Sequence, residues 1–149
     1  MKNHLFVTSL LIIMLTLTPV ITHAGQAAQD LAVCLTDSIN GKERKNLAKW
    51  IYFGMSTHST IKPYTKATQK DFDGMNKYVG GLITRLMTED CPQTANAAFK
   101  EGGTSSIQYA FGIVGEVAMQ ELMTEPSVSQ ALGAFEKYLD QDKFDQTFQ

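Results

Sequence analysis

Residues 104–123, with the sequence TSSIQYAFGIVGEVAMQELM, decide the fold. Their apolar residues recur at helical spacing: Ile107, Phe111, Val114, Ala118 and Leu122 share one side, and Ile113 and Val117 share another. A helix that is apolar on more than one side is buried against several neighbours. The stretch therefore predicts a helix at the centre of a bundle, in which Gly112 and Gly115 allow a neighbouring helix to approach closely.

Helical patterns occupy the rest of the chain as well, and almost no window alternates polar and apolar residues for long. The expected helices cover residues 26–38, 42–57, 68–90, 92–103 and 104–123, and a last one begins near residue 126. Gly102 and Gly103 mark the end of the short fourth helix. The predicted fold class is all-α, a compact bundle of five or six helices.

The helix after Thr68 has the clearest amphipathic pattern. Thr68 and Asp71 form a start that resembles a capping box. An apolar stripe follows at Phe72, Met75, Val79, Leu82, Ile83 and Leu86. Gly80 and Gly81 lie on the less apolar side, where two glycines imply close packing or a kink.

The C-terminal region is expected to add one more helix to the core. The residues that it should bury are Val128, Ala131, Leu132, Phe135 and Leu139. A short acidic tail with Phe144 and Phe148 follows. The tail lacks the glycine and the final glutamate of a calcium-binding loop, so it predicts no calcium site.

The first 24 residues predict a cleaved signal peptide. Lys2 precedes an apolar run from Leu5 to Ile21, and Thr22-His23-Ala24 places small residues at the first and third positions before a break. Residues 25–149 then form a single α-helical domain. The expected location is periplasmic or secreted, with no membrane contact after cleavage.

The two cysteines of the chain, Cys34 and Cys91, predict one disulfide. An even pair in an oxidising compartment is ordinarily bonded. The spacing is far from the Cys-x-x-Cys arrangement of redox-active pairs. The bond would tie the first helix to the fourth and stabilise the bundle.

Charge is distributed unevenly, although the net charge is small. The 13 basic residues include Lys2, so 12 basic and 15 acidic side chains remain after cleavage. Residues 42–77 hold eight basic and three acidic residues, whereas residues 116–149 hold seven acidic and two basic ones. The halves are expected to pair within one domain or across a homodimer, and the chain lacks the concentrated basic patch of a nucleic-acid binder.

A basic and aromatic surface is predicted around the second helix. Its candidate partner-binding residues are Lys42, Lys45, Lys49 and Trp50, with Lys62 and Tyr64 in the loop that follows. The three lysines repeat at steps of three and four and so share one helical face. The pattern favours a different interpretation of residues 50–55: because this half of the helix is apolar all round, it is expected to be buried in the core.

No catalytic, metal or cofactor motif is present in the mature chain. His58 is its only histidine, which excludes a histidine-rich metal site, and no Cys-x-x-Cys-His haem motif occurs. Glu121 falls on the apolar side of its helix with no partner identifiable in the sequence. A hydrolase that uses His58, Glu116 or Glu121 would need two of these groups to converge in a cleft.

The sequence therefore favours a small exported protein that acts by binding another protein, rather than an enzyme. This architecture is broadly similar to that of periplasmic immunity proteins, which neutralise cell-wall-degrading effectors, and of acid-stress chaperones. The alternative is a carrier of a small apolar ligand that enters between helices. Its opening would be lined by Met75, Met87, Met119 and Met123.

Overall fold

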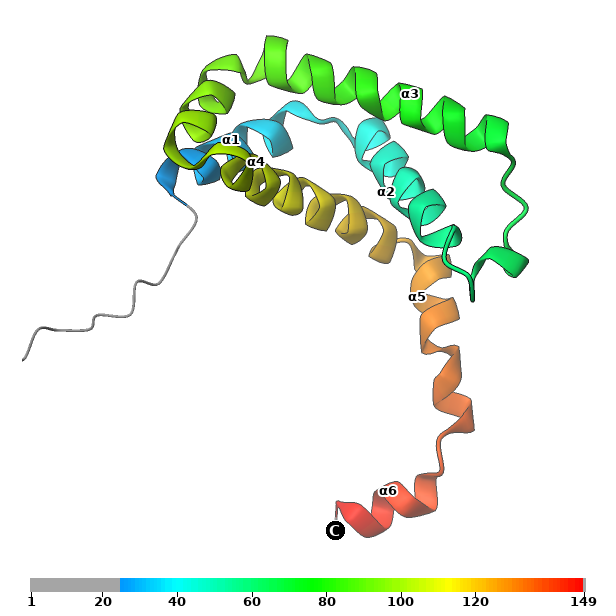
Figure 1. The fold of residues 1–149 in the computed structure, drawn as a ribbon. Helices are drawn as coiled ribbons and strands as arrows, with labels where there is room; N and C mark the ends of the chain where they lie inside the picture. The colour runs from blue at the N-terminus through cyan, green and yellow to red at the C-terminus, as the bar shows by residue number, and fades with distance from the viewer. Residues whose placement is uncertain (1–24, 149) are drawn as a thin grey trace, which may run out of the picture.

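The longest helix, α4, lies at the centre of the fold, and α1 and α2 both pack on it (Figure 1). The computed structural model describes residues 25–148, so the predicted signal peptide lies outside the described residues. The α-helices are α1 (Gln26–Ser38), α2 (Gly41–Ser56), α3 (Gln69–Arg85), α4 (Pro92–Met123), α5 (Pro126–Gly133) and α6 (Gln141–Thr147). Two 3-10 turns, η1 (Lys62–Tyr64) and η3 (Ala134–Tyr138), and one π turn, η2 (Leu86–Asp90), complete the described chain. The predicted all-α class is confirmed.

A row of small side chains explains why α4 can take two neighbours. Its buried residues are Ala95, Ala98, Ser106, Ala110, Val114 and Ala118. They recur mostly every four positions, so they form one ridge along the helix. Small side chains let the axis of a partner helix approach, and α1 fills the space with Leu31 and Leu35, both fully buried.

The close approach expected at Gly112 and Gly115 does not occur. A Cβ atom added at either glycine would meet no other atom within 4 Å. Alanine, rather than glycine, therefore provides the close contact on α4. Gly80 and Gly81 of α3 also face open space, so close packing does not explain them.

The break predicted at Gly102-Gly103 is present within α4. Gly103 has φ 59° and ψ −140°, which is not a helical conformation. A residue with a Cβ atom is strained at such a positive φ, whereas glycine adopts it readily. The predicted fourth and fifth helices are thus two segments of one element, with the interruption at Gly103.

Both long helices that follow loops begin with a capping box. At α2, Asn40 accepts a hydrogen bond from the Glu43 amide, and Glu43 accepts one from the Asn40 amide. At α3, Thr68 and Asp71 form the predicted pair. Hydrogen bonds donated by the Thr68 side chain and amide lower the pKa of the Asp71 carboxyl. These caps satisfy amides that the first turn leaves without helical partners.

The predicted disulfide joins Cys34 of α1 to Cys91 at the start of α4. Cys91 is 2% exposed and belongs to the hydrophobic core. Ser38 donates a hydrogen bond of 3.6 Å to the Cys91 sulfur, which carries no hydrogen of its own. The bond therefore holds the first helix against the central one.

The favoured prediction, that the latter half of α2 is buried in the core, is wrong. Trp50, Tyr52 and Met55 are 39%, 45% and 46% exposed. The buried side of α2 is narrow, with Leu47, Ala48 and Ser56. α2 packs on α4 and on α3, but these contacts leave Trp50, Tyr52 and Met55 partly accessible.

The predicted C-terminal core helix is also wrong. Residues 126–148, here called the C-terminal arm, leave the bundle at the end of α4 and project away from it (Figure 1). None of the residues of α5, η3 and α6 is buried. The expected tail forms the short helix α6, capped by Asp140, whose side chain accepts a hydrogen bond from the Lys143 amide. The apolar stripe was interpreted as core, but it faces open space.

Removal of the disulfide should destabilise the bundle by about 4 kcal/mol in the chain-entropy model, because the bond closes a long loop. The measurement is urea unfolding of the oxidised protein with and without a reductant. The double variant Cys34→Ala/Cys91→Ala is the control, and reductant should not change its midpoint. An unchanged midpoint for the wild-type protein on reduction would contradict the assignment.

Candidate functional site

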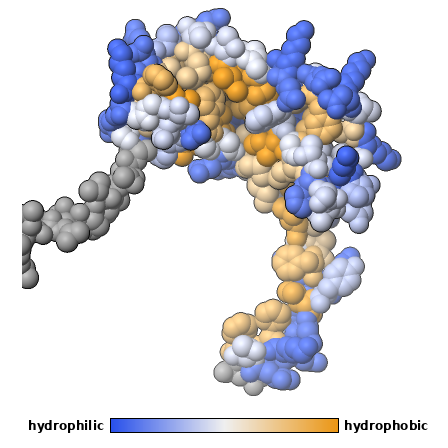
Figure 2. Space-filling view, viewed as in Figure 1, coloured by the Kyte–Doolittle hydropathy of each residue, from blue (hydrophilic) through white to orange (hydrophobic). Residues whose placement is uncertain are grey.

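An apolar groove lies between α2, α3 and α4. Its inner part has a volume of about 190 Å³ and is lined by apolar residues from all three helices, among them Leu47, Ile51, Leu82, Phe111 and Val114. An adjoining depression of about 440 Å³ is lined by Phe53, Phe72, Met75 and Asn76. Trp50 and Ile51 line both parts. Figure 2 shows hydrophobic side chains exposed in the hollow below α3.

α3 is attached to the bundle through α2 and through η2, which continues from its C-terminus. Val79, Leu82 and Leu86 of its apolar stripe are buried in the core, where Val114 and Ala118 of α4 also lie. Phe72, Met75 and Ile83 are only partly buried and line the groove. Partly exposed apolar residues that gather in a hollow are typical of a binding groove.

Trp50 lies at the junction of the two parts of the groove. Its Nε1 donates a hydrogen bond of 2.9 Å to Asn76 Oδ1, which joins α2 to α3. The ring is 39% exposed. A fixed, half-exposed tryptophan in an apolar groove is typical of an energetic hot spot for binding.

The three lysines of the predicted surface lie elsewhere on α2. Lys45 and Lys49 line a separate depression of about 370 Å³ together with Tyr52, Leu122 and Glu125. Lys42, Lys45 and Lys49 are all exposed. The predicted surface is therefore divided, because Trp50 faces the apolar groove toward α3 and the lysines flank the depression toward α4.

Lys62 and Tyr64 occupy a third place, the η1 turn beyond the end of α2. Tyr64 is 86% exposed, and Lys62 is exposed as well. The expectation that this loop is accessible is confirmed. The structure does not place the two residues in either depression.

Glu121 has partners that the sequence did not reveal. Arg44 Nε lies 3.4 Å from Glu121 Oε2, and Lys45 Nζ lies 3.9 Å from Glu121 Oε1. The pairing joins the basic half of the chain to its acidic half, as the uneven charge distribution predicted. Glu121 is therefore an ion-pair residue between α4 and α2.

The predicted set of four methionines does not gather at one opening. Met75 lines the groove, Met87 packs against the core, and Met123 is 45% exposed. The groove is lined instead by aromatic and branched aliphatic residues. Of the four methionines, only Met75 is among the residues that line the groove.

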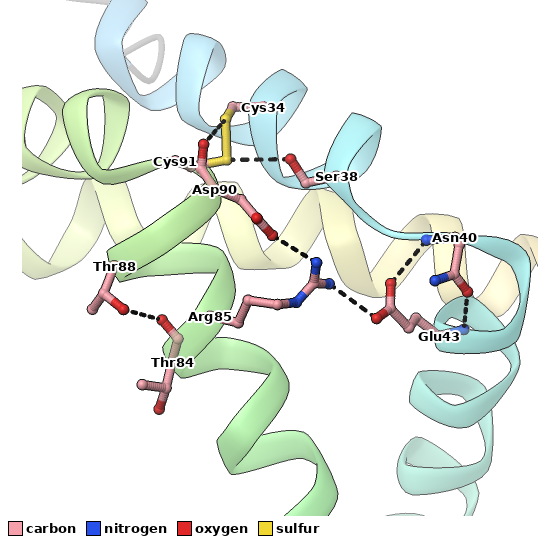
Figure 3. A network of polar contacts seen from close by, with 9 residues as sticks. All are labelled: Cys34, Ser38, Asn40, Glu43, Thr84, Arg85, Thr88, Asp90 and Cys91. Carbon is pink, nitrogen blue, oxygen red and sulfur yellow. Dashed lines mark hydrogen bonds and ion pairs between the residues drawn. A yellow bond between two sulfur atoms is a disulfide. The ribbon is translucent and has the colours of Figure 1, made fainter.

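A polar network joins the disulfide corner to the start of α2 (Figure 3). Arg85 donates to Glu43 Oε1 at 2.9 Å and pairs with Asp90 Oδ2 at 2.9 Å. Glu43 is also the capping residue of α2, so Arg85 fixes α3 to the N-terminus of α2. Sequence spacing could not predict this network, because Glu43 and Arg85 are far apart in the chain.

The three side chains considered for catalysis, His58, Glu116 and Glu121, have different neighbours. His58 Nδ1 lies 2.9 Å from Thr60 Oγ1, Glu121 pairs with basic residues, and Glu116 is exposed. Within residues 25–148, no group of three or more His, Cys, Asp and Glu side chains is arranged to hold a metal ion.

No protein-family model matches this chain, and neither a curated protein nor a solved structure matches it. Among the helices of residues 25–148, none combines the length and apolar character needed to cross a membrane.

Replacement of Arg85 by Met should lower the free energy of unfolding by about 2 kcal/mol, because two partly buried carboxylates lose their cationic partner. Arg85→Lys should recover only part of this loss, since lysine cannot bond both carboxylates as a planar fork. Urea unfolding measures both variants. Equal stability of Arg85→Met and the wild type would show that the network does not hold α3.

Proposed function

We propose that this protein is an exported protein-binding module whose C-terminal arm contacts its partner. The observation that carries the proposal is the exposed apolar surface of the arm. Its large exposed residues are Leu132, Phe135, Tyr138, Leu139, Phe144 and Phe148. Figure 2 shows hydrophobic colour along the arm, away from the body of the bundle.

Apolar side chains that are exposed to water raise the free energy of the monomer. Tyr138 and Phe148 are 79% and 77% exposed, and Phe135 is 59% exposed. Burial of apolar area contributes about 25 cal/mol per Å², so covering several such side chains in a partner offers several kcal/mol. Contiguous apolar surface of this kind on a small protein is typical of an interaction site.

Export is supported by the N-terminal sequence pattern and by the disulfide. Disulfides persist in the periplasm and outside the cell, where thiols are not kept reduced. Within the protein-binding class, the module is proposed to be immunity-like or inhibitor-like, acting on a protein met outside the cytoplasm. A stress chaperone would use the same apolar arm for less specific contacts.

The exposed lysine face of α2 is the proposed electrostatic part of the partner surface. Lys42 and Lys49 are exposed, and α2 carries four basic residues and one acidic residue. Charges at the rim of an interface steer association and make it sensitive to salt. Lys45 is less suitable for a test because it already pairs with Glu121.

The double variant Leu132→Ser/Phe135→Ser should lose capture of the partner while the bundle stays folded, because neither residue is buried. The matched control is Val33→Ser/Phe99→Ser, which removes apolar residues of similar exposure, 60% and 61%, from other helices. Affinity capture from the native cells and from co-cultured neighbours, followed by mass spectrometry, measures the outcome. Equal capture by both variants would contradict a role for the arm.

Charge reversal in Lys42→Glu/Lys49→Glu should slow association with the captured partner and reduce its dependence on salt. Lys70→Glu/Lys100→Glu is the charge-matched control, because these lysines are exposed on α3 and on the first half of α4. Association rates at low and high salt give the result. If the two variants behave alike, the lysine face of α2 is not part of the interface.

The apolar groove favours a second candidate, a carrier of a small apolar ligand. Its inner part is enclosed by three helices and lined by apolar residues. Native mass spectrometry of protein purified without denaturation distinguishes the two functions. A carrier retains an additional bound mass, whereas a protein-binding module does not.

A further inference from the structure

We infer that the apolar groove receives the C-terminal arm of a second copy of this chain, so that two copies exchange arms in a symmetric dimer. The inference rests on the proposed protein-binding function of the arm and names its partner. The protein thus carries both halves of one interface. The groove is lined by apolar residues, and none of the apolar residues of α5, η3 and α6 is buried. A two-fold dimer would fill both grooves with both arms, as isologous interfaces do.

The dimensions of the two surfaces agree. From Val128 to Leu139, across the end of α5 and the 3-10 turn η3, the arm spans roughly 19 Å, and the groove-lining stretch of α3 from Phe72 to Leu86 spans roughly 21 Å. The arm carries apolar residues at steps of three and four, at Val128, Ala131, Leu132, Phe135, Tyr138 and Leu139. This is the spacing with which an amphipathic helix binds a groove.

The net charges of the arm and of α2 are opposite. Residues 126–149 carry four acidic and two basic side chains, whereas α2 carries four basic and one acidic. Lys45 and Lys49 of α2 line the depression on its α4 side, and Arg44 and Lys45 already pair with Glu121. The opposite charges therefore favour the encounter of two copies at long range, whereas the apolar contacts of the groove hold the arm.

The root of the arm directs it away from its own groove. The Glu125 amide donates to the Leu122 carbonyl at 3.2 Å, and the Val128 amide donates to the Glu125 carbonyl at 3.0 Å. Ser129 Oγ donates to the Met123 carbonyl at 2.9 Å. An arm folded back into its own groove would have to break these bonds, whereas an arm that enters a second copy keeps them.

Gly115 provides a way to block the groove without damage to the core. It lines the inner part, and a Cβ atom added there would meet nothing within 4 Å. Gly115→Leu should therefore fold and fill the groove. Gly81→Leu is the control, because Gly81 is exposed on α3 with equally open space and does not line the groove.

The test is sedimentation velocity of the oxidised protein, expressed from the full chain, from micromolar to millimolar concentration. The wild type and Gly81→Leu should dimerise. Gly115→Leu and the arm variant Leu132→Ser/Phe135→Ser should each raise the dissociation constant by at least about tenfold. An equimolar mixture of these two variants should regain association through one contact, because the first keeps its arm and the second keeps its groove.

Four outcomes would overturn the inference. One is a wild-type protein that stays monomeric at every concentration, as it would with the arm in its own groove. Another is a dimer that Gly115→Leu does not weaken, which would indicate contact between arms alone. The third is a mixture of the two variants that does not associate. The fourth is a monomer that retains a bound small molecule in native mass spectrometry.

Failure of this inference can be separated from failure of the proposed function. If the wild type is monomeric but the arm variant loses capture of another protein, the arm binds proteins and the second-copy assignment is wrong. If neither self-association nor capture depends on the arm, both proposals are wrong.

Discussion

The row of small residues along α4 is the constraint on which the rest of the structure depends. Ala98, Ala110 and Ala118 are fully buried, and their size allows α1 and α2 to lie close to the same helix. The disulfide adds a covalent link at the N-terminal end of this contact. Because α1 and α2 occupy the buried side of α4, little contact surface is left for α3 along the same helix.

α3 lies where it does because α1 and α2 leave it little of the surface of α4. Its attachment consists of the contact with α2, the π turn that leads to Cys91, and the Arg85 ion pairs with Glu43 and Asp90. Because α3 is attached through these contacts, it covers only part of the core. Its apolar stripe is therefore divided between the core, where Val79 and Leu86 are buried, and the open groove.

Most of the fold could be predicted from local sequence features, because these depend on contacts a few residues apart. Local features of this type are the α-helical class, the bounds of α1, the capping box at Thr68 and the break at Gly103. The disulfide was predictable because only two cysteines exist. Periodicity could not show whether the stripe at Leu132 and Phe135 faces a core or a partner, since burial within a chain and at an interface require the same pattern. The groove and the Arg85 network depend on the relative placement of whole helices, so no local signal could reveal them.

The C-terminal arm and the apolar groove are proposed to be two halves of one interface between chains. Hydrogen–deuterium exchange with mass spectrometry, at protein concentrations below and above the dimerisation range, can detect such an interface. The amides of residues 126–147 and of the groove-lining parts of α2 and α3 are expected to gain protection together as the concentration rises. If the arm exchanges rapidly at every concentration and the groove helices do not change, the two surfaces do not bind each other.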